Sequence, residues 1–152
     1  MSHPLIGSPA PDFTLVNQAG TPITLSGLRG TPVLVVFTPF AFSPLCTSEI
    51  LDLRDSGEIG RDDAVRVLTI TCDSVFANRA WADATEYKRD VLSDFWPHGA
   101  VCRAYGIFDE KAGRAVRASF LVDAAGVVRW ATVNDADHTR DIEDYAEAIA
   151  AL

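Results

Sequence analysis

The sequence predicts an α/β domain in which helices flank a central mixed β-sheet. Residues 33–37 are five consecutive apolar residues, which is typical of a central strand covered on both faces. Strand-like and helix-like segments alternate through the middle of the chain, and hairpins are expected towards both of its ends. A chain of 152 residues suits one sizeable core, so residues 1–152 are expected to form a single domain.

The first hairpin is expected after a leading segment, residues 1–10, that is punctuated by Pro and Gly. Residues 11–16 alternate polar and apolar side chains, as a half-buried strand does. Residues 17–20 supply the turn, and residues 22–25 resemble the partner strand. Residues 26–30 are predicted to form a short helical turn or a loop.

Two strand–helix units are predicted next. The first joins the strand at 33–37 to a helix from about Pro44 to Asp55. The second joins a strand at 66–71 to a helix at 75–88. The helix residues expected to face the core are Ile50, Leu51, Leu53, Val75, Phe76 and Trp81.

The last third of the chain is predicted to complete the sheet and close with a helix. The expected elements are a short strand at 91–93, a helix near 98–105, strands at about 115–122 and 127–132 joined by a turn at 123–126, and an Ala-rich helix at 139–151. In such a domain a ligand site is expected where central strands end and helices begin. The turn after residues 33–37 is such a place.

The charge and hydropathy of the chain exclude several classes of function. A net charge of −8 and a pI of about 4.7 argue against nucleic-acid binding and against attraction to anionic membranes. No segment is long and apolar enough to span a bilayer. The start Met1-Ser2-His3-Pro4 lacks a basic patch followed by an apolar run, so no secretory signal and a cytoplasmic location are expected.

The chain has three cysteines, Cys46, Cys72 and Cys102, at wide spacings. An odd number without close pairs suits neither a disulfide framework nor a zinc site, so no metal and no cofactor are expected. Separated cysteines in a cytosolic chain are usually small buried side chains. The alternative is a reactive thiol.

Cys46 occupies a position that favours a reactive thiol. Ser43 is a good N-cap residue, and Pro44 suits the first position of the helix that follows. This arrangement places Cys46 in the first turn, where free backbone N–H groups and the helix dipole favour a thiolate. The thiolate is the nucleophilic form of cysteine. The position alone also allows a packed, inert cysteine.

The segment around Cys46 resembles the peroxiredoxin active-site motif P-x-x-x-(T/S)-x-x-C. The matching residues are Pro39, Ser43 and Cys46, with Glu49 three residues further on. Three further segments resemble family signatures in the same order, namely residues 10–15, 92–106 and 117–123. The chain looks most similar to the one-cysteine alkyl hydroperoxide reductase E type. This resemblance implies a thioredoxin-like fold and a thiol peroxidase that acts on hydrogen peroxide, organic hydroperoxides and peroxynitrite through a sulfenic acid.

The resemblance also implies roles for individual residues. Cys46 would be the peroxidatic cysteine, and Pro39 would shield its sulfur from water. Ser43 would exchange hydrogen bonds with the sulfur and the peroxide, although the family more often has threonine there. Arg117 would stabilise the thiolate and polarise the peroxide, and Glu49 would orient that arginine. Taken without the resemblance, Ser43 is a plain helix cap, Arg117 is undecided, and Glu49 is a solvated helix residue.

No cysteine occupies the resolving positions of the family, so Cys72 and Cys102 are interpreted as buried structural thiols. The oxidised Cys46 would then be reduced by an external thiol. The candidates are a low-molecular-weight thiol such as mycothiol, and a thioredoxin-, glutaredoxin- or mycoredoxin-like protein. The family resemblance also implies a homodimer, with Phe37, Phe40 and Phe42 as candidate contacts or as the lining of the substrate pocket.

Three rival functions follow from the same residues. A thioredoxin-like disulfide reductase would need a C-x-x-C pair, and Ser43 stands three residues before Cys46. A redox sensor or holdase would oxidise Cys46 once and stop, whereas an enzyme would turn over. A metal-binding module is the weakest alternative, because the candidate ligands are not clustered in the sequence. His98 and His138 are assigned no catalytic role.

Overall fold

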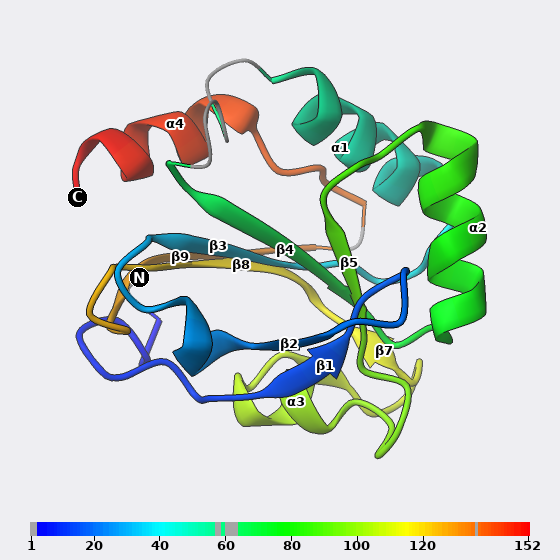
Figure 1. Ribbon diagram of the computed structural model, residues 1–152, viewed down its shortest axis with the longest axis horizontal. Coiled ribbons are helices and arrows are strands. Elements are labelled where there is room, and N and C mark those ends of the chain that lie inside the picture. Colours follow the sequence, from blue (N-terminus) through cyan, green and yellow to red (C-terminus); the bar gives the residue numbers. More distant parts are fainter. Residues whose placement is uncertain (1–2, 57–58, 60–63, 136) are drawn as a thin grey trace.

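The computed structural model describes residues 3–56, 59, 64–135 and 137–152. A seven-stranded mixed sheet forms its centre, with the strand order β2-β1-β5-β4-β3-β8-β9 (Figure 1). Its strands are β1 (Thr14–Val16), β2 (Pro22–Thr24), β3 (Val33–Phe37), β4 (Arg66–Thr71), β5 (Asp90–Ser93), β8 (Arg117–Val122) and β9 (Val128–Asn134). The strands β3, β4 and β5 are parallel neighbours, while β8 runs antiparallel to β3 and β9 runs antiparallel to β8. The predicted mixed sheet is therefore present.

The helices cover both faces of this sheet. They are the 3₁₀ turn η1 (Leu25–Leu28) and the helices α1 (Pro44–Asp55), α2 (Val75–Thr85), α3 (Ala100–Ala104) and α4 (Ile142–Ala150). Figure 1 shows α1, α2 and α4 on one side of the central strands β3, β4 and β8, and α3 together with the strands β1 and β2 at the edge of the sheet on the other side. None of the described helices is long and apolar enough to cross a membrane.

The alternation of side chains along β3 divides the core into two layers. Leu34 and Val36 pack in a cluster with α1, α2 and α4. Val33, Val35 and Phe37 pack in a second cluster, on the opposite face, with α3 and the β1–β2 hairpin. All five residues of β3 are buried, as their uninterrupted apolar run predicts. The cysteines are divided in the same way, with Cys46 in the first cluster and Cys72 and Cys102 in the second.

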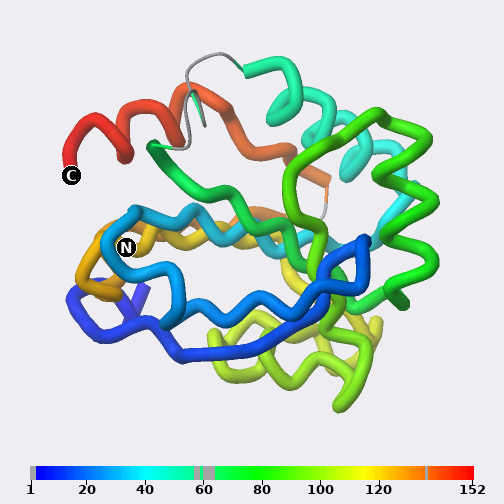
Figure 2. Tube along the Cα trace, viewed as in Figure 1, coloured from blue at the N-terminus to red at the C-terminus, as the bar shows by residue number. Residues whose placement is uncertain are grey.

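The leading segment is held against the far end of the sheet. Gly7 N–H donates to the Val128 carbonyl at 2.8 Å, and Ala10 N–H donates to the Gly126 carbonyl at 2.9 Å. Figure 2 shows this segment, in blue, beside the turn that joins β8 to β9. Residues 1 and 2 of the segment lie outside the described residues.

Two expectations about elements need correction. Phe76 does not face the core, because its side chain is 84% exposed while Trp81 is 1% exposed. The buried positions of α2 are Asn78, Trp81, Ala82 and Thr85, which form one helical stripe, and Phe76 lies on the other side of the helix. A small hairpin of β6 (Phe108–Asp109) and β7 (Arg114–Ala115) also precedes β8, where the sequence predicted one longer strand.

Candidate active site

The turn after β3 leads directly into α1, as the sequence predicts. Pro39 is buried just after the strand, and Ser43 is the N-cap of the helix with Pro44 at its first position. The Ser43 Oγ accepts a hydrogen bond from the Cys46 N–H at 3.3 Å. Cys46 therefore lies at the third position of the first turn, where the helix dipole favours a negative charge.

Arg117 lies beside the Cys46 sulfur. Its Nη2 is 3.5 Å from Sγ, and the two residues are 3% and 0% exposed, respectively. Arg117 is the first residue of β8, and β8 pairs with β3 so that Ala118 lies opposite Phe37. The pairing of these two strands therefore brings together two residues that lie 71 positions apart in the sequence.

Glu49 is buried and connects to this guanidinium. It lies one turn after Cys46 in α1 and is only 6% exposed, so its interpretation as a solvated helix residue is wrong. Its Oε1 accepts a hydrogen bond from Nη1 of Arg117. The Glu49 carboxylate thus holds Nη1 of the Arg117 guanidinium in place, while Nη2 of the same group faces the Cys46 sulfur.

A second arginine, Arg140, completes the cluster and was not predicted from the sequence. Its backbone N–H and its Nε both donate to Glu49 Oε2 at 2.8 Å, and its Nη2 donates to Oε1 at 2.9 Å. Its Nη1 donates to the carbonyls of Phe37, at 2.6 Å, and Ala118, at 2.8 Å. Burial lowers the pKa of this guanidinium below its usual range, while the Cys46 sulfur and Tyr145 oppose the shift.

The charged side chains beside Cys46 do not cancel one another. Arg117 and Arg140 carry two positive charges and Glu49 carries one negative charge, so the three side chains have one net positive charge. A Cys46 thiolate makes the group neutral, whereas a thiol leaves the excess charge buried. Because an uncompensated charge in a protein interior is costly, this excess positive charge suits an anionic group beside it.

The turn that precedes Cys46 is tied to the end of β4. Ala41 N–H donates to the Asp73 carboxylate at 2.8 Å. Phe42 has a φ of 70°, a left-handed conformation that is uncommon for a bulky side chain. Phe40 and Phe42 are 39% and 54% exposed, whereas Phe37 is buried, so Phe37 is not available as one of the dimer contacts proposed for these three residues.

The remaining candidates lie in other surroundings. His98 hydrogen-bonds to the carbonyls of Phe95 and Gly113, at 3.1 and 2.7 Å, and the side chain of His138 is 74% exposed. Cys72 and Cys102 are buried, as expected. They are not isolated, however: with Asp94 they form a group of donor atoms within 4.8 Å of one another. The inference that no candidate ligands cluster was therefore wrong at this place, because sequence spacing does not reveal contacts between distant segments.

Comparisons with known proteins agree with the fold. Residues 6–131 match the model of the AhpC/TSA family. The chain is 41% identical to alkyl hydroperoxide reductase E of Mycobacterium tuberculosis over 148 residues, which cover 97% of each chain. It is 36% identical to a peroxiredoxin of Thermoplasma volcanium, covering 97% of this chain and 74% of that protein. The crystal structure of Enterococcus faecalis AhpC superposes with a TM-score of 0.88 at 29% identity, covering 99% of this chain and 92% of that one, which confirms the expected thioredoxin-like fold.

Proposed function

The chain belongs to the AhpC/TSA family of peroxiredoxins, which are peroxidases that reduce hydroperoxides, and we propose that it works by a one-cysteine mechanism centred on Cys46. The observation that carries this proposal is the buried Cys46 sulfur at a helix start, 3.5 Å from a guanidinium that Glu49 holds in place. The proposed substrates are hydrogen peroxide, organic hydroperoxides and peroxynitrite. The half-exposed rings of Phe40 and Phe42 beside the site favour substrates with an apolar group.

The first step transfers one oxygen atom to sulfur. The Cys46 thiolate attacks the terminal oxygen of the hydroperoxide, the O–O bond breaks, and the electron pair leaves on the other oxygen. Arg117 stabilises this developing charge with a fixed donor. Ser43 Oγ already accepts from the Cys46 N–H, so its own O–H can donate to the peroxide. The products are the sulfenic acid of Cys46 and, after the leaving oxygen takes a proton from solvent, an alcohol from an organic hydroperoxide or water from hydrogen peroxide.

The second step is proposed to use an external thiol, because the sheet separates Cys46 from the other two cysteines. Cys46 packs with α1 and α2 on one face, while Cys72 and Cys102 pack on the opposite face. A thiol attacks the sulfenic sulfur and releases water, and a second thiol then frees Cys46 as a disulfide forms between the two reductants. Low-molecular-weight thiols such as mycothiol, and thioredoxin- or mycoredoxin-like proteins of the cytoplasm, are the proposed reductants.

One equivalent of hydrogen peroxide is expected to add one oxygen atom to the protein at Cys46. The sulfenic acid should persist until a thiol is added, since no other described thiol packs on the Cys46 side of the sheet. Intact mass spectrometry, with dimedone as the trap and peptide mapping, checks this. Excess peroxide should then produce the sulfinic acid. A disulfide that includes Cys46 would contradict the one-cysteine mechanism.

Turnover separates an enzyme from a redox sensor. With peroxide and an added thiol, many equivalents of peroxide should disappear for each equivalent of protein. Comparing mycothiol, glutathione, a thioredoxin and a mycoredoxin at matched concentrations would identify the reductant. If Cys46 oxidised once and none of these thiols restored it, the sensor function would replace the peroxidase cycle proposed here.

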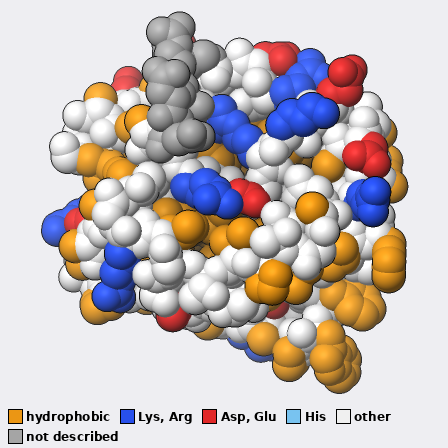
Figure 3. All heavy atoms as spheres, in the orientation of Figure 1, with side chains coloured by type: hydrophobic (Ala, Val, Ile, Leu, Met, Phe, Trp, Pro, Cys, Tyr) orange, Lys and Arg blue, Asp and Glu red, His pale blue; other side chains and the backbone are white. Residues whose placement is uncertain are grey.

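The protein is also proposed to form a homodimer through the loops at the active-site end of the sheet. Exposed aromatic side chains follow all three parallel strands there: Phe40 and Phe42 after β3, Phe76 after β4, and Phe95 and Trp96 after β5. Parallel strands end at the same edge, so these loops are neighbours. Figure 3 shows hydrophobic side chains gathered at the corner that holds the start of α2 and the loop after β5. Aromatic residues of this kind are enriched in protein interfaces.

Sedimentation at micromolar concentration is expected to give a dimer, and Phe76→Lys should shift it towards monomer. Phe76 is 84% exposed, so the substitution leaves the core intact. Val133→Lys provides a matched control, since Val133 is an exposed apolar residue on β9. A wild-type monomer, or equal dissociation by both variants, would contradict an interface at this edge.

A further inference from the structure

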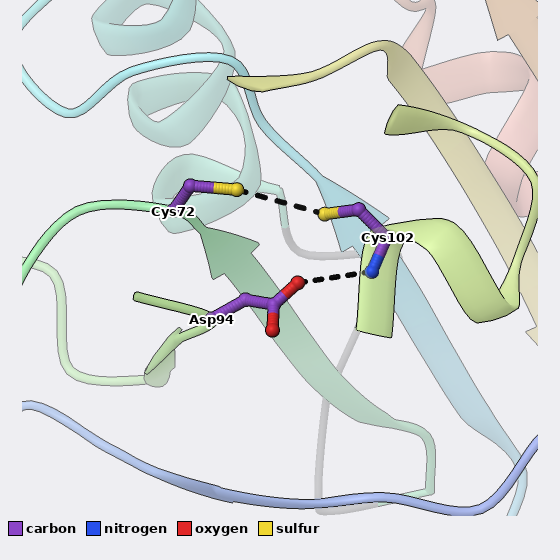
Figure 4. Close-up of side chains that lie close together, drawn as sticks. All are labelled: Cys72, Asp94 and Cys102. Atoms are coloured by element: carbon purple, nitrogen blue, oxygen red, sulfur yellow. Dashed lines mark hydrogen bonds between the residues drawn. The ribbon is translucent and has the colours of Figure 1, made fainter. Parts of the chain in front are cut away.

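Cys72 and Cys102 face each other on the side of the sheet opposite Cys46. Cys72 directly follows β4, and Cys102 lies in the middle of α3. Their sulfur atoms are 3.8 Å apart, although the residues are 30 positions apart in the sequence. Figure 4 shows the two thiols pointing at one another above the Asp94 carboxylate. Two buried thiols in direct contact form a chemical site of their own.

The surroundings enclose both thiols and favour the neutral form of Cys102. They are 4% and 0% exposed and belong to the apolar cluster that includes Phe37 and Leu92. The hydrogen bond with Cys72, burial and the nearby Asp94 carboxylate all raise the pKa of the Cys102 thiol. The Asp94 carboxylate accepts the backbone N–H groups of Val101 and Cys102, at 3.1 and 2.9 Å. It therefore holds the first turn of α3 in position, and with it the sulfur of Cys102.

Two kinds of chemistry suit such a pair, metal binding and disulfide formation. A divalent ion bound by the three side chains would have two thiolates and one carboxylate as ligands. The three negative charges exceed the two positive charges of the ion, so one negative charge would remain in an apolar cluster. Within the described residues, the group of donors contains no fourth ligand to complete a tetrahedral site. A disulfide is neutral and apolar, so it suits this cluster better.

We propose that Cys72 and Cys102 form a second redox site, which a hydroperoxide oxidises to an intramolecular disulfide. One sulfur attacks the peroxide, the O–O bond breaks, and the leaving oxygen takes the thiol proton to give an alcohol and a sulfenic acid. The other sulfur then attacks that sulfenic sulfur. An S–S bond forms, the S–O bond breaks, and the hydroxide leaves with the second proton as water. The two sulfurs are oxidised by two electrons in total, and one hydroperoxide is reduced.

The reaction at this pair is expected to be much slower than the reaction at Cys46. Both thiols are buried, so we expect a peroxide to reach them only when α3 opens. This helix has five residues, and short elements open locally at low cost. We expect oxidation on the order of minutes to hours, the range of uncatalysed disulfide chemistry. The disulfide would join the end of β4 to α3, next to Asp73, whose carboxylate holds the turn before Cys46.

The test uses the variant Cys46→Ser, so it does not depend on the function proposed for Cys46. The folded variant is incubated with excess hydrogen peroxide and then unfolded in the presence of an alkylating agent. Its mass is measured by intact mass spectrometry. The expected result is a loss of two hydrogens, no alkylation, and a linked pair of peptides that contains Cys72 and Cys102. The double variant Cys46→Ser/Cys72→Ala is the control and should show no such loss.

Each other outcome overturns the proposal. These outcomes are two free thiols after prolonged oxidation, stepwise addition of oxygen without a disulfide, or a disulfide between two chains. A stoichiometric metal ion in native mass spectrometry of the purified protein would assign the site to metal binding instead. If Cys46→Ser fails to fold, peptide mapping of the wild-type protein after the same oxidation gives the same answer. The oxidised protein should also melt several degrees higher than the reduced one, as expected for a new cross-link.

Discussion

Replacing Cys46 with serine should remove the rapid reaction with hydrogen peroxide entirely. The substitution deletes the nucleophile and keeps the size of the side chain, so the observed rate is expected to fall by a factor on the order of 10⁴ or more. Stopped-flow fluorescence in a single turnover measures this directly. Trp81 provides a local signal, because it is buried in the same cluster as Cys46 and its Nε1–H donates to the neighbouring Thr47 at 3.1 Å.

A double variant provides the matched comparison for this experiment. Cys72→Ala/Cys102→Ala removes the other two thiols and leaves Cys46, Arg117 and Glu49 in place, so it should keep the fast phase. Both variants should retain the circular dichroism spectrum of the parent. A fast phase that survives in Cys46→Ser, or disappears in the double variant, would transfer the peroxidatic role away from Cys46.

The sequence predicted the parts of this site that depend on local pattern. The apolar run of β3, the N-cap Ser43 and the proline after it are signals within a few residues, and they locate the start of α1 and the position of Cys46. Arg117 was found only through the family resemblance, because an arginine at a strand start is usually a surface residue. The pairing of β3 with β8 gives it its buried position beside the sulfur.

The features that the sequence did not predict arise from contacts between distant segments. Arg140 stands among polar residues before α4, a pattern typical of a solvated loop, yet it is 5% exposed and reaches Glu49 across the sheet end. Cys72 and Cys102 are 30 residues apart and meet only after β4 and α3 are packed. Phe76 was assigned to the core because it is apolar. The buried face of α2 contains Asn78 and Trp81, however, and Phe76 lies on the opposite, solvent-exposed face.

Replacing Arg117 with methionine should slow peroxide reduction by a factor on the order of 10² or more, as expected for the loss of a preorganised charged donor. The substitution removes one of the two positive charges around Glu49, so Arg140 and Glu49 then balance each other. A Cys46 thiolate would in that case leave one negative charge buried, whereas with Arg117 present the same thiolate would be balanced. The variant should show a lower thiolate absorbance at neutral pH together with the slower reaction.

The shape of the side chain should matter as well as its charge. Arg117→Lys restores the positive charge. Lysine has a compact ammonium group, however, and lacks the two rigidly spaced nitrogens with which Arg117 contacts Glu49 and the Cys46 sulfur. Its rate should therefore lie between those of Arg117→Met and the wild type. Arg129→Met is the matched control, since Arg129 is an exposed arginine that pairs with Asp123. If Arg117→Met reacted as fast as this control, Arg117 would have only a packing role beside Cys46. If Arg117→Lys reacted as fast as the wild type, Arg117 would contribute only its positive charge.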